Sequence, residues 1–162
     1  MKINVYIDTA TKGEESYKHW GQSTYMWVAH FDGKAVHCRA KLFRMSREGT
    51  NKILCRGIID IILSLEDYFN DIDALEIFTD NKMIVEYINS LGPKRGELGF
   101  YHEKIEVLIE SAPTKIKLTW LSRTDPRIKC VDLIAKRVRD FKELDDTLAK
   151  ALAVVKRASI PK

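Results

Sequence analysis

The sequence predicts one α/β domain built on a five-stranded mixed sheet, with three antiparallel strands, then two parallel ones, and helices on both faces. The chain begins with three runs rich in apolar, β-branched and aromatic residues, two of them joined by the hairpin signal Asp32-Gly33-Lys34. It then alternates amphipathic helical patterns with two short apolar runs, an order typical of sheets whose later strands are parallel. A length of 162 residues with 45% hydrophobic residues is enough for one sizeable core.

The expected strands are short runs bounded by turn residues. The first is predicted at residues 3–8, and the polar segment 9–22 is predicted to be a loop because it contains Gly13 and Gly21. The other strands are expected at 23–31, 35–43, 75–80 and 115–121. Lysines alternate with apolar residues in the last of these, which places it near an edge of the sheet.

Apolar residues at a helical period predict three helices before the last strand, at 52–69, 81–91 and 100–111. Thr50 or Asn51 is the expected N-cap of the first helix. Asp60 falls on the polar face of that helix at this spacing.

One long helix, or two helices with a break near 143–146, is predicted from Cys130 onward, after a polar loop at 122–129, because no Gly or Pro follows until Pro161. Its apolar residues have a heptad-like spacing, which indicates packing back onto the sheet; binding of a protein partner through this helix is the alternative. We expect residues 1–142 to form the domain and residues 143–162 to form a C-terminal helical extension.

Composition excludes several classes of protein. No run of 18 or more apolar residues predicts a membrane span, and the N-terminus leads directly into a strand without a secretory segment. The three cysteines include no CxxC and the four histidines have no metal-ligand spacing, so neither disulfides nor a zinc site are expected. These features predict a cytoplasmic protein.

Positive charge is modest overall but concentrated in one segment. The formal net charge of +4 permits nucleic-acid binding without demonstrating it. Between Cys38 and Arg56 the basic residues outnumber the single acid, Glu48; they are Arg39, Lys41, Arg44, Arg47, Lys52 and Arg56. This segment is either a patch that faces phosphate or a solvated edge strand and loop.

Three aspartates mark the candidate site. Asp8 and Asp80 each follow a short apolar strand, and Asp132 lies near the expected start of the last helix. If the two strands are parallel neighbours, Asp8 and Asp80 emerge side by side at the carboxyl edge of the sheet, where ligands of such sheets bind. Clustered carboxylates repel unless they share a proton or a cation, and such hard oxygen ligands suit Mg²⁺ or Mn²⁺.

The order of these motifs resembles the ribonuclease H family. The similar stretches, over roughly residues 1–140, are Val5-Tyr6-Ile7-Asp8, Thr50-Asn51, Phe78-Thr79-Asp80, Leu118-Thr119-Trp120-Leu121 and Val131-Asp132-Leu133-Ile134-Ala135. The resemblance implies an RNase H-like fold and a nuclease in which four carboxylates hold two Mg²⁺ ions that cleave the RNA strand of an RNA–DNA hybrid.

By this resemblance Asp8 would bridge both metals, and Asp80 and Asp132 would each complete one metal site. Contacts to the nucleic acid are expected from residues near these aspartates and on the first helix: Thr9, Asn51, Asn81, Lys52 and Arg56. Backbone N–H groups at the start of that helix are natural partners for phosphate.

The sequence also departs from the family pattern. The fourth carboxylate is a Glu five residues beyond the Thr of the first helix, and here that position is Cys55, a poor ligand for Mg²⁺. The family's His loop is replaced by Ser122–Arg127, which contains no His. Asp125 or Glu48 are possible substitutes for the missing acid.

Two functional classes therefore stay open. One is a metal-dependent ribonuclease acting on RNA–DNA hybrids or a related duplex. The other is a catalytically degenerate module of the same fold that binds nucleic acid or a protein partner. A different nuclease or integrase chemistry on this fold is a third, smaller possibility.

Overall fold

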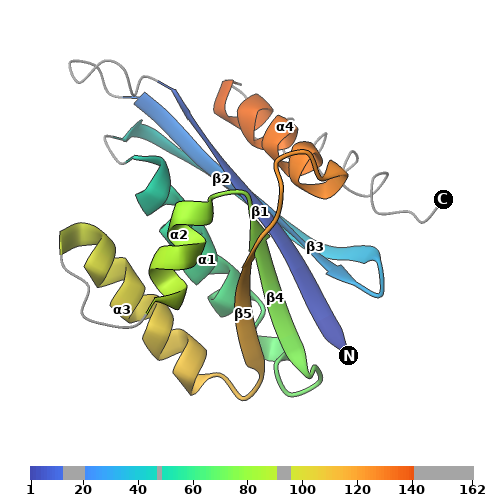
Figure 1. The fold of residues 1–162 in the computed structure, drawn as a ribbon. Coiled ribbons are helices and arrows are strands. Elements are labelled where there is room, and N and C mark those ends of the chain that lie inside the picture. Colours follow the sequence, from blue (N-terminus) through green and yellow to red (C-terminus); the bar gives the residue numbers. More distant parts are fainter. Residues whose placement is uncertain (13–20, 47–48, 91–95, 141–162) are drawn as a thin grey trace.

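One mixed sheet of five strands organises the protein, in the order β3-β2-β1-β4-β5 (Figure 1). The computed structural model describes residues 1–12, 21–46, 49–90 and 96–140. Antiparallel pairing joins β1 to β2 and β2 to β3, and parallel pairing joins β1 to β4 and β4 to β5. The strands are β1 (Lys2–Lys12), β2 (Gly21–Phe31), β3 (Lys34–Ser46), β4 (Ala74–Thr79) and β5 (Lys115–Trp120).

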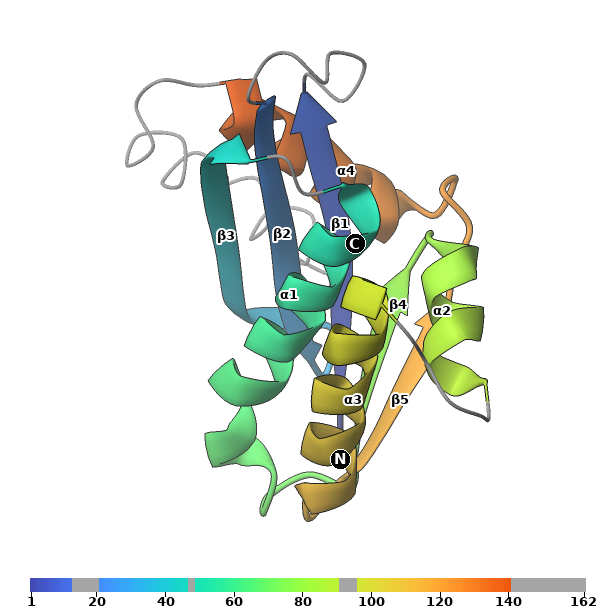
Figure 2. The same cartoon turned by 90° about the vertical axis from the view of Figure 1, so that its left-hand side faces the viewer.

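Helices cover both faces of this sheet. Figure 2 shows α1 and α3 in front of the sheet, with α4 behind it. The helices are α1 (Thr50–Ser64), the short 3₁₀ helix η1 (Glu66–Tyr68), α2 (Lys82–Asn89), α3 (Gly96–Ser111) and α4 (Pro126–Asp140). The predicted five-stranded mixed sheet with helices on both faces is thus confirmed. None of the helices in the described part of the chain is long and apolar enough to cross a membrane.

Strand alternation divides the core into two layers. Along β1, Ile3, Val5 and Ile7 pack against α1 in one hydrophobic cluster. Tyr6 and Ala10, from the alternate positions, pack with α4 in a second cluster. Because successive side chains of a strand point to opposite faces, Asp8 belongs with Tyr6 and Ala10 on the α4 side.

Gly57 lets α1 lie close to the sheet. A Cβ atom at this position would lie 2.4 Å from Cδ1 of Ile7 and 3.1 Å from Cγ of Tyr25. A side chain there would have to displace the buried faces of β1 and β2. The glycine therefore sets the distance at which α1, with its N-terminus near the ends of β1 and β4, crosses the sheet.

Several predicted boundaries differ from the structure. The predicted loop at 9–22 begins too early, because β1 continues to Lys12, where it still pairs with Gln22 of β2. Backbone pairing in a hairpin needs no apolar side chains, so the polar residues concealed this extension. The N-cap of α1 is Gly49 instead of Thr50 or Asn51, and it has no side-chain cap hydrogen bond.

The last two helices also begin earlier than predicted. The helix expected from residue 100 starts at Gly96, and the one expected from Cys130 starts at Pro126. Proline is well suited to the first turn of a helix, where its missing N–H has no intrahelical partner in any case. The predicted extension at 143–162, with its protein partner, lies outside the described residues.

The prediction that Asp60 lies on the polar face of the first helix, directed to solvent, is wrong. The carboxylate is only 15% exposed and lies 3.4 Å from Nε of Arg39. It accepts hydrogen bonds from the Tyr25 hydroxyl (2.9 Å) and the Trp27 indole N–H (3.0 Å), both on β2, and from Ser64 one turn later (3.1 Å). These contacts fasten α1 to the antiparallel half of the sheet.

Candidate active site

Asp8, Asp80 and Asp132 line one cavity of about 430 Å³ beside the carboxyl end of β4. They come from three elements that are far apart in the sequence. The other described residues of the lining are neutral or basic: Thr9, Thr50, Leu54, Thr79, Asn81, Lys82, Arg123 and Lys136. The structure thus brings the three predicted carboxylates together.

The pairing register of β1 and β4 brings the first two aspartates side by side. Tyr6 lies opposite Phe78 in this parallel pair, and their rings stack with centroids 5.2 Å apart. The same register, continued by two residues, sets Asp8 opposite Asp80. Side chains two residues apart share a face, so both carboxylates lie beyond the stacked rings on the α4 side of the sheet.

Asp132 reaches the cavity from α4. Because this helix begins at Pro126, Asp132 lies near its middle and is not the first-turn residue that the sequence suggested. Val131, Ile134 and Ala135, its neighbours along the helix, are buried against β1 and β2. Packing of the helix on the sheet therefore aims Asp132 at the strand ends.

Burial and repulsion by neighbouring negative charges both raise the pKa of Asp8, a residue that is only 8% exposed. Burial, followed by the negative charge of Asp80 and then by Asp132, raises the pKa of Asp8 to about 8. One contact opposes this rise, because the backbone N–H of Thr9 donates a 2.8 Å hydrogen bond to Oδ1 of Asp8. The innermost carboxylate therefore favours a proton in the absence of a bound cation.

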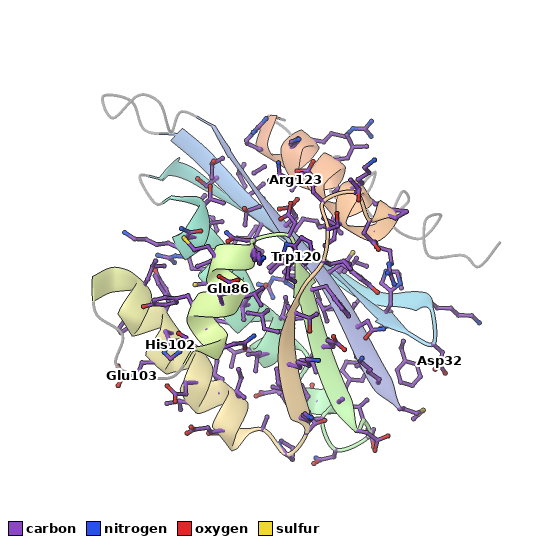
Figure 3. All side chains as sticks on the ribbon, in the orientation of Figure 1. Asp32, Glu86, His102, Glu103, Trp120 and Arg123 are labelled. Atoms are coloured by element: carbon purple, nitrogen blue, oxygen red, sulfur yellow. The ribbon has the colours of Figure 1, made fainter. Side chains whose placement is uncertain are left out.

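Each of the two outer carboxylates is paired with a basic side chain. Nε of Arg123, on the loop between β5 and α4 (Figure 3), lies 3.1 Å from Oδ2 of Asp80. Nζ of Lys136 lies 2.9 Å from Oδ2 of Asp132. The carboxylate oxygens suit a hard divalent cation chemically, yet among the described residues no three His, Cys, Asp or Glu side chains are arranged to hold a metal ion as they stand.

The first long helix contributes no carboxylate to this cavity. Thr50 and Leu54, one turn apart, are the α1 residues in the described lining. Cys55 is instead fully buried in the hydrophobic cluster between α1 and the sheet, and burial raises the pKa of its thiol to about 12. Leu54 belongs to the same buried cluster but also touches the cavity, whereas Cys55 has only a core position.

Asp125, a possible substitute acid, is engaged elsewhere. Its carboxylate accepts from Nε and Nη2 of Arg127 at 3.1 and 3.0 Å, and these contacts lower its pKa. Nη1 of the same arginine donates to the Tyr6 hydroxyl at 2.7 Å. Asp125 thus helps to fix the start of α4 and is not part of the described lining. Glu48, the other substitute, lies outside the described residues.

The residues expected to contact substrate fall into two groups. Thr9 and Asn81 line the cavity. Asn51 lies next to them, because Nδ2 of Asn81 donates a 2.9 Å hydrogen bond to Oδ1 of Asn51. Oδ1 of Asn81 also accepts a hydrogen bond from the backbone N–H of Ile84 at the start of α2. This pair of asparagines ties the N-termini of α1 and α2 together beside the aspartates.

Two arginines of the basic segment, Arg39 and Arg56, are engaged within the protein. Lys52 and Arg56 are not in the described lining. The Arg56 guanidinium lies over the rings of Phe43 and Tyr101, at 5.4 and 5.8 Å from their centroids. Arg39 pairs with Asp60. The side chains of Arg44 and Arg47 lie outside the described part of the chain.

The sequence reasoning missed the basic residues of the cavity. One signal was available for Lys136, which is four residues after Asp132 and hence on the same face of α4. Arg123 and Lys82 carried no comparable signal, because their position depends on how β4, β5 and α4 meet. Lys82 lies over the ring of Trp120, 5.9 Å from its centroid, at the same end of the sheet.

No protein-family model matches the sequence, and no curated protein matches it. Solved structures do match. RNase H1 of the halophilic archaeon Halobacterium salinarum is 16% identical, with a TM-score of 0.62 over 81% of this chain and 94% of that one. The N-terminal RNase H domain of a Mycobacterium tuberculosis protein is 17% identical, with a TM-score of 0.66 over 86% of this chain and 100% of that one.

A third similar structure is LC11-RNase H1, isolated from compost by a metagenomic approach and solved in complex with an RNA/DNA hybrid. It is 14% identical, with a TM-score of 0.62 over 80% of this chain and 92% of that one. At these identities the likeness shows the fold alone. Together with the strand order and the helices on both faces, it shows that the chain has the ribonuclease H-like fold.

Proposed function

We propose that the protein is a ribonuclease H-type, metal-dependent nuclease that hydrolyses phosphodiester bonds, with the RNA strand of RNA–DNA hybrids as substrate. One observation carries this proposal. Asp8, Asp80 and Asp132, delivered by two parallel strands and the last helix, line a single cavity at the carboxyl edge of the sheet. The same fold occurs in a protein whose structure contains an RNA/DNA hybrid.

Asp8, Asp80 and Asp132 are the residues that would hold Mg²⁺ or Mn²⁺. Bound divalent ions would supply an activated water and stabilise the leaving oxygen in an in-line displacement. Asp8, the most buried of the three, would bind the ion as a carboxylate, because a nearby cation would offset the burial and the negative charges that raise its pKa. Asp80 and Asp132 would hold the ion beside it, and their oxygens would have to exchange the contacts with Arg123 and Lys136 for it.

Groups around the aspartates are suited to a polyanionic backbone. The N-terminus of α1 opens at Thr50 on the cavity, and helix N-termini favour phosphate. Thr9 and Lys82 add a hydroxyl and an ammonium group to the same cavity. We assign these groups to phosphate and sugar contacts, which position a duplex without reading its sequence.

A second function is favoured by a specific observation. In the described lining α1 contributes Thr50 and the buried Leu54 but no carboxylate, and two basic side chains engage Asp80 and Asp132. These features suit a degenerate module that binds nucleic acid without cleaving it. Three carboxylates converging on one cavity, which a binding module does not need and which repel a phosphate backbone, favour the nuclease.

A cleavage assay separates the two functions. Labelled RNA–DNA hybrid, double-stranded DNA and single-stranded RNA are each incubated with the protein in Mg²⁺ or in Mn²⁺, with Asp80→Asn purified in parallel as the control. The nuclease proposal expects hybrid cleavage that requires the ion and is absent in Asp80→Asn. Equal cleavage by both preparations would indicate a contaminating nuclease.

Absence of cleavage with either ion would overturn the nuclease proposal. In that case, binding of the uncleaved hybrid at several salt concentrations distinguishes the remaining possibilities. Affinity that falls steeply as salt rises indicates phosphate contacts. No binding at low salt would indicate a protein partner instead.

A further inference from the structure

We propose that Lys136 and Arg123 are tethered counter-cations that compete with a divalent metal ion for Asp132 and Asp80. Each basic group contacts one oxygen of a carboxylate that a metal ion would need. The two side chains therefore lower the affinity of the site for the metal ion. This inference rests on the metal site of the proposed function and names the residues that regulate it.

Lys136 is held in place by the geometry of α4. It lies four residues after Asp132, so the two side chains are neighbours on one face of the helix. Nζ is 2.9 Å from Oδ2 of Asp132, and both residues line the cavity. The side chains are 53% and 29% exposed, so the pair lies at the cavity mouth.

Arg123 reaches the cavity from a different element, the loop after β5. Its Nε donates to Oδ2 of Asp80 at 3.1 Å. The Asp80 side chain is only 10% exposed, whereas that of Arg123 is 85% exposed. The guanidinium therefore covers a buried carboxylate from the solvent side, and it can move away without disturbing the core.

The absence of a carboxylate at Leu54 makes this competition matter. The described lining contains three aspartates against three basic side chains, Lys82, Arg123 and Lys136, and α1 adds only the hydroxyl of Thr50 and the apolar Leu54. A divalent ion that enters must displace the ammonium and guanidinium groups or be repelled by them. The charge of the incoming ion is thus partly opposed by charges already in place.

Mn²⁺ binding tests this inference without reference to activity. The free Mn²⁺ signal in electron paramagnetic resonance gives the affinity of the wild type, Lys136→Met, Arg123→Met and Lys129→Met. Lys129 is exposed on α4 and is not in the described lining, so its substitution removes the same charge without opening a carboxylate. Lys136→Arg, which keeps the charge, serves as the rescue variant.

We expect Lys136→Met to bind Mn²⁺ about tenfold more tightly than the wild type, and Arg123→Met about threefold more tightly, since the charge pairs are partly exposed and screened. Lys129→Met and Lys136→Arg should stay within about twofold of the wild type. Unchanged affinity in Lys136→Met and Arg123→Met, or no Mn²⁺ binding in any variant, would overturn the inference.

Amine labelling of the wild type provides a second readout. Acetylation of Lys136 by an N-hydroxysuccinimide ester, followed by peptide mass spectrometry, should become faster when Mn²⁺ is added, while labelling of Lys129 stays constant. A Lys136 rate that does not respond to Mn²⁺ would contradict displacement. If Lys136→Met binds Mn²⁺ more tightly but the wild type does not cleave the hybrid, this inference stands and the nuclease proposal fails. If the wild type cleaves the hybrid but Lys136→Met does not change Mn²⁺ binding, the nuclease proposal stands and this inference fails.

Discussion

Leu54 and Cys55 are neighbours on α1, and both are buried in the hydrophobic cluster between the helix and the sheet, but Leu54 also lines the aspartate cavity whereas Cys55 is not part of its described lining. One residue along a helix is a rotation of about 100°. The α1 residue that reaches the cavity is therefore Leu54, four residues after Thr50. The family motif predicts the site residue five residues after Thr50, at Cys55.

This relationship predicts different responses to Mn²⁺ for two similar substitutions. Leu54→Glu adds a carboxylate at a buried residue that lines the candidate metal site, so it should destabilise the metal-free protein, and Mn²⁺ should raise its Tm more than it raises that of the wild type. Cys55→Glu buries a charge in an apolar cluster and should destabilise the protein by about 3 kcal/mol or more, with no recovery in Mn²⁺. Thermal unfolding with and without Mn²⁺ measures both, and a larger Mn²⁺ effect in Cys55→Glu would mean that α1 is turned by one residue.

The protonation of Asp8 predicts a pH-dependent stability. Its pKa in the folded protein is about 8 against an ordinary value of 3.8, so the unfolded chain releases this proton first. The folded state therefore loses stability as pH rises from about 4 to about 8, without metal. Asp8→Asn removes this loss, and its gain in unfolding free energy over the wild type should grow with pH to a few kcal/mol at pH 8.

Denaturant unfolding at pH 4, 6 and 8 in a chelator measures the Asp8→Asn difference. Asp67→Asn, a change at an exposed carboxylate of η1, is the matched control and should show no such trend. A constant difference between Asp8→Asn and the wild type across this range would show that Asp8 ionises normally in the folded protein.

Asp60 predicts a stability effect away from the cavity. Asp60→Ala leaves the Tyr25 hydroxyl and the Trp27 indole N–H without their shared acceptor, and it removes the ion pair with Arg39. We expect a loss of about 2–4 kcal/mol in unfolding free energy, since buried donors lose their partner. Asp67→Ala should cost less than about 0.5 kcal/mol. Equal effects of the two substitutions in urea unfolding would show that the network does not hold α1 to the sheet.

The strand pattern was sufficient to predict the sheet because two signals agreed. Asp32-Gly33 defined the hairpin, and both residues indeed have positive φ, while short apolar runs alternating with helical patterns indicated that the later strands, β4 and β5, are parallel. The polar end of β1 was missed because pairing with β2 is a property of the backbone and leaves no apolar signature.

The candidate site was predictable only in part. Asp8 and Asp80 follow apolar strands, so their arrival at one edge of the sheet follows from the chain order and from parallel pairing. The spacing of four residues between Asp132 and Lys136 was a local signal for their pairing. The position of Arg123, the orientation of Leu54 and the bonds to Asp60 depend instead on helix rotation and loop path. Those are set by tertiary packing, such as the close approach at Gly57, and no local pattern records them.

The proposed function requires that the aspartates of the cavity are the catalytic ones, and substitutions of two aspartates that lie seven residues apart in the sequence test this most directly. Asp132 lines the cavity, whereas Asp125 is tied to Arg127 outside it. The measurement is the rate of hybrid cleavage in Mn²⁺ by the wild type, Asp132→Asn and Asp125→Asn, with folding checked by circular dichroism.

We predict that Asp132→Asn lowers this rate at least about 100-fold, because removing a direct metal ligand should reduce activity more than removing a residue that only orients a ligand. The rate of Asp125→Asn should stay within a few fold of the wild type. A rate in Asp132→Asn equal to that of the wild type, or a loss in Asp125→Asn as large as that in Asp132→Asn, would contradict the account.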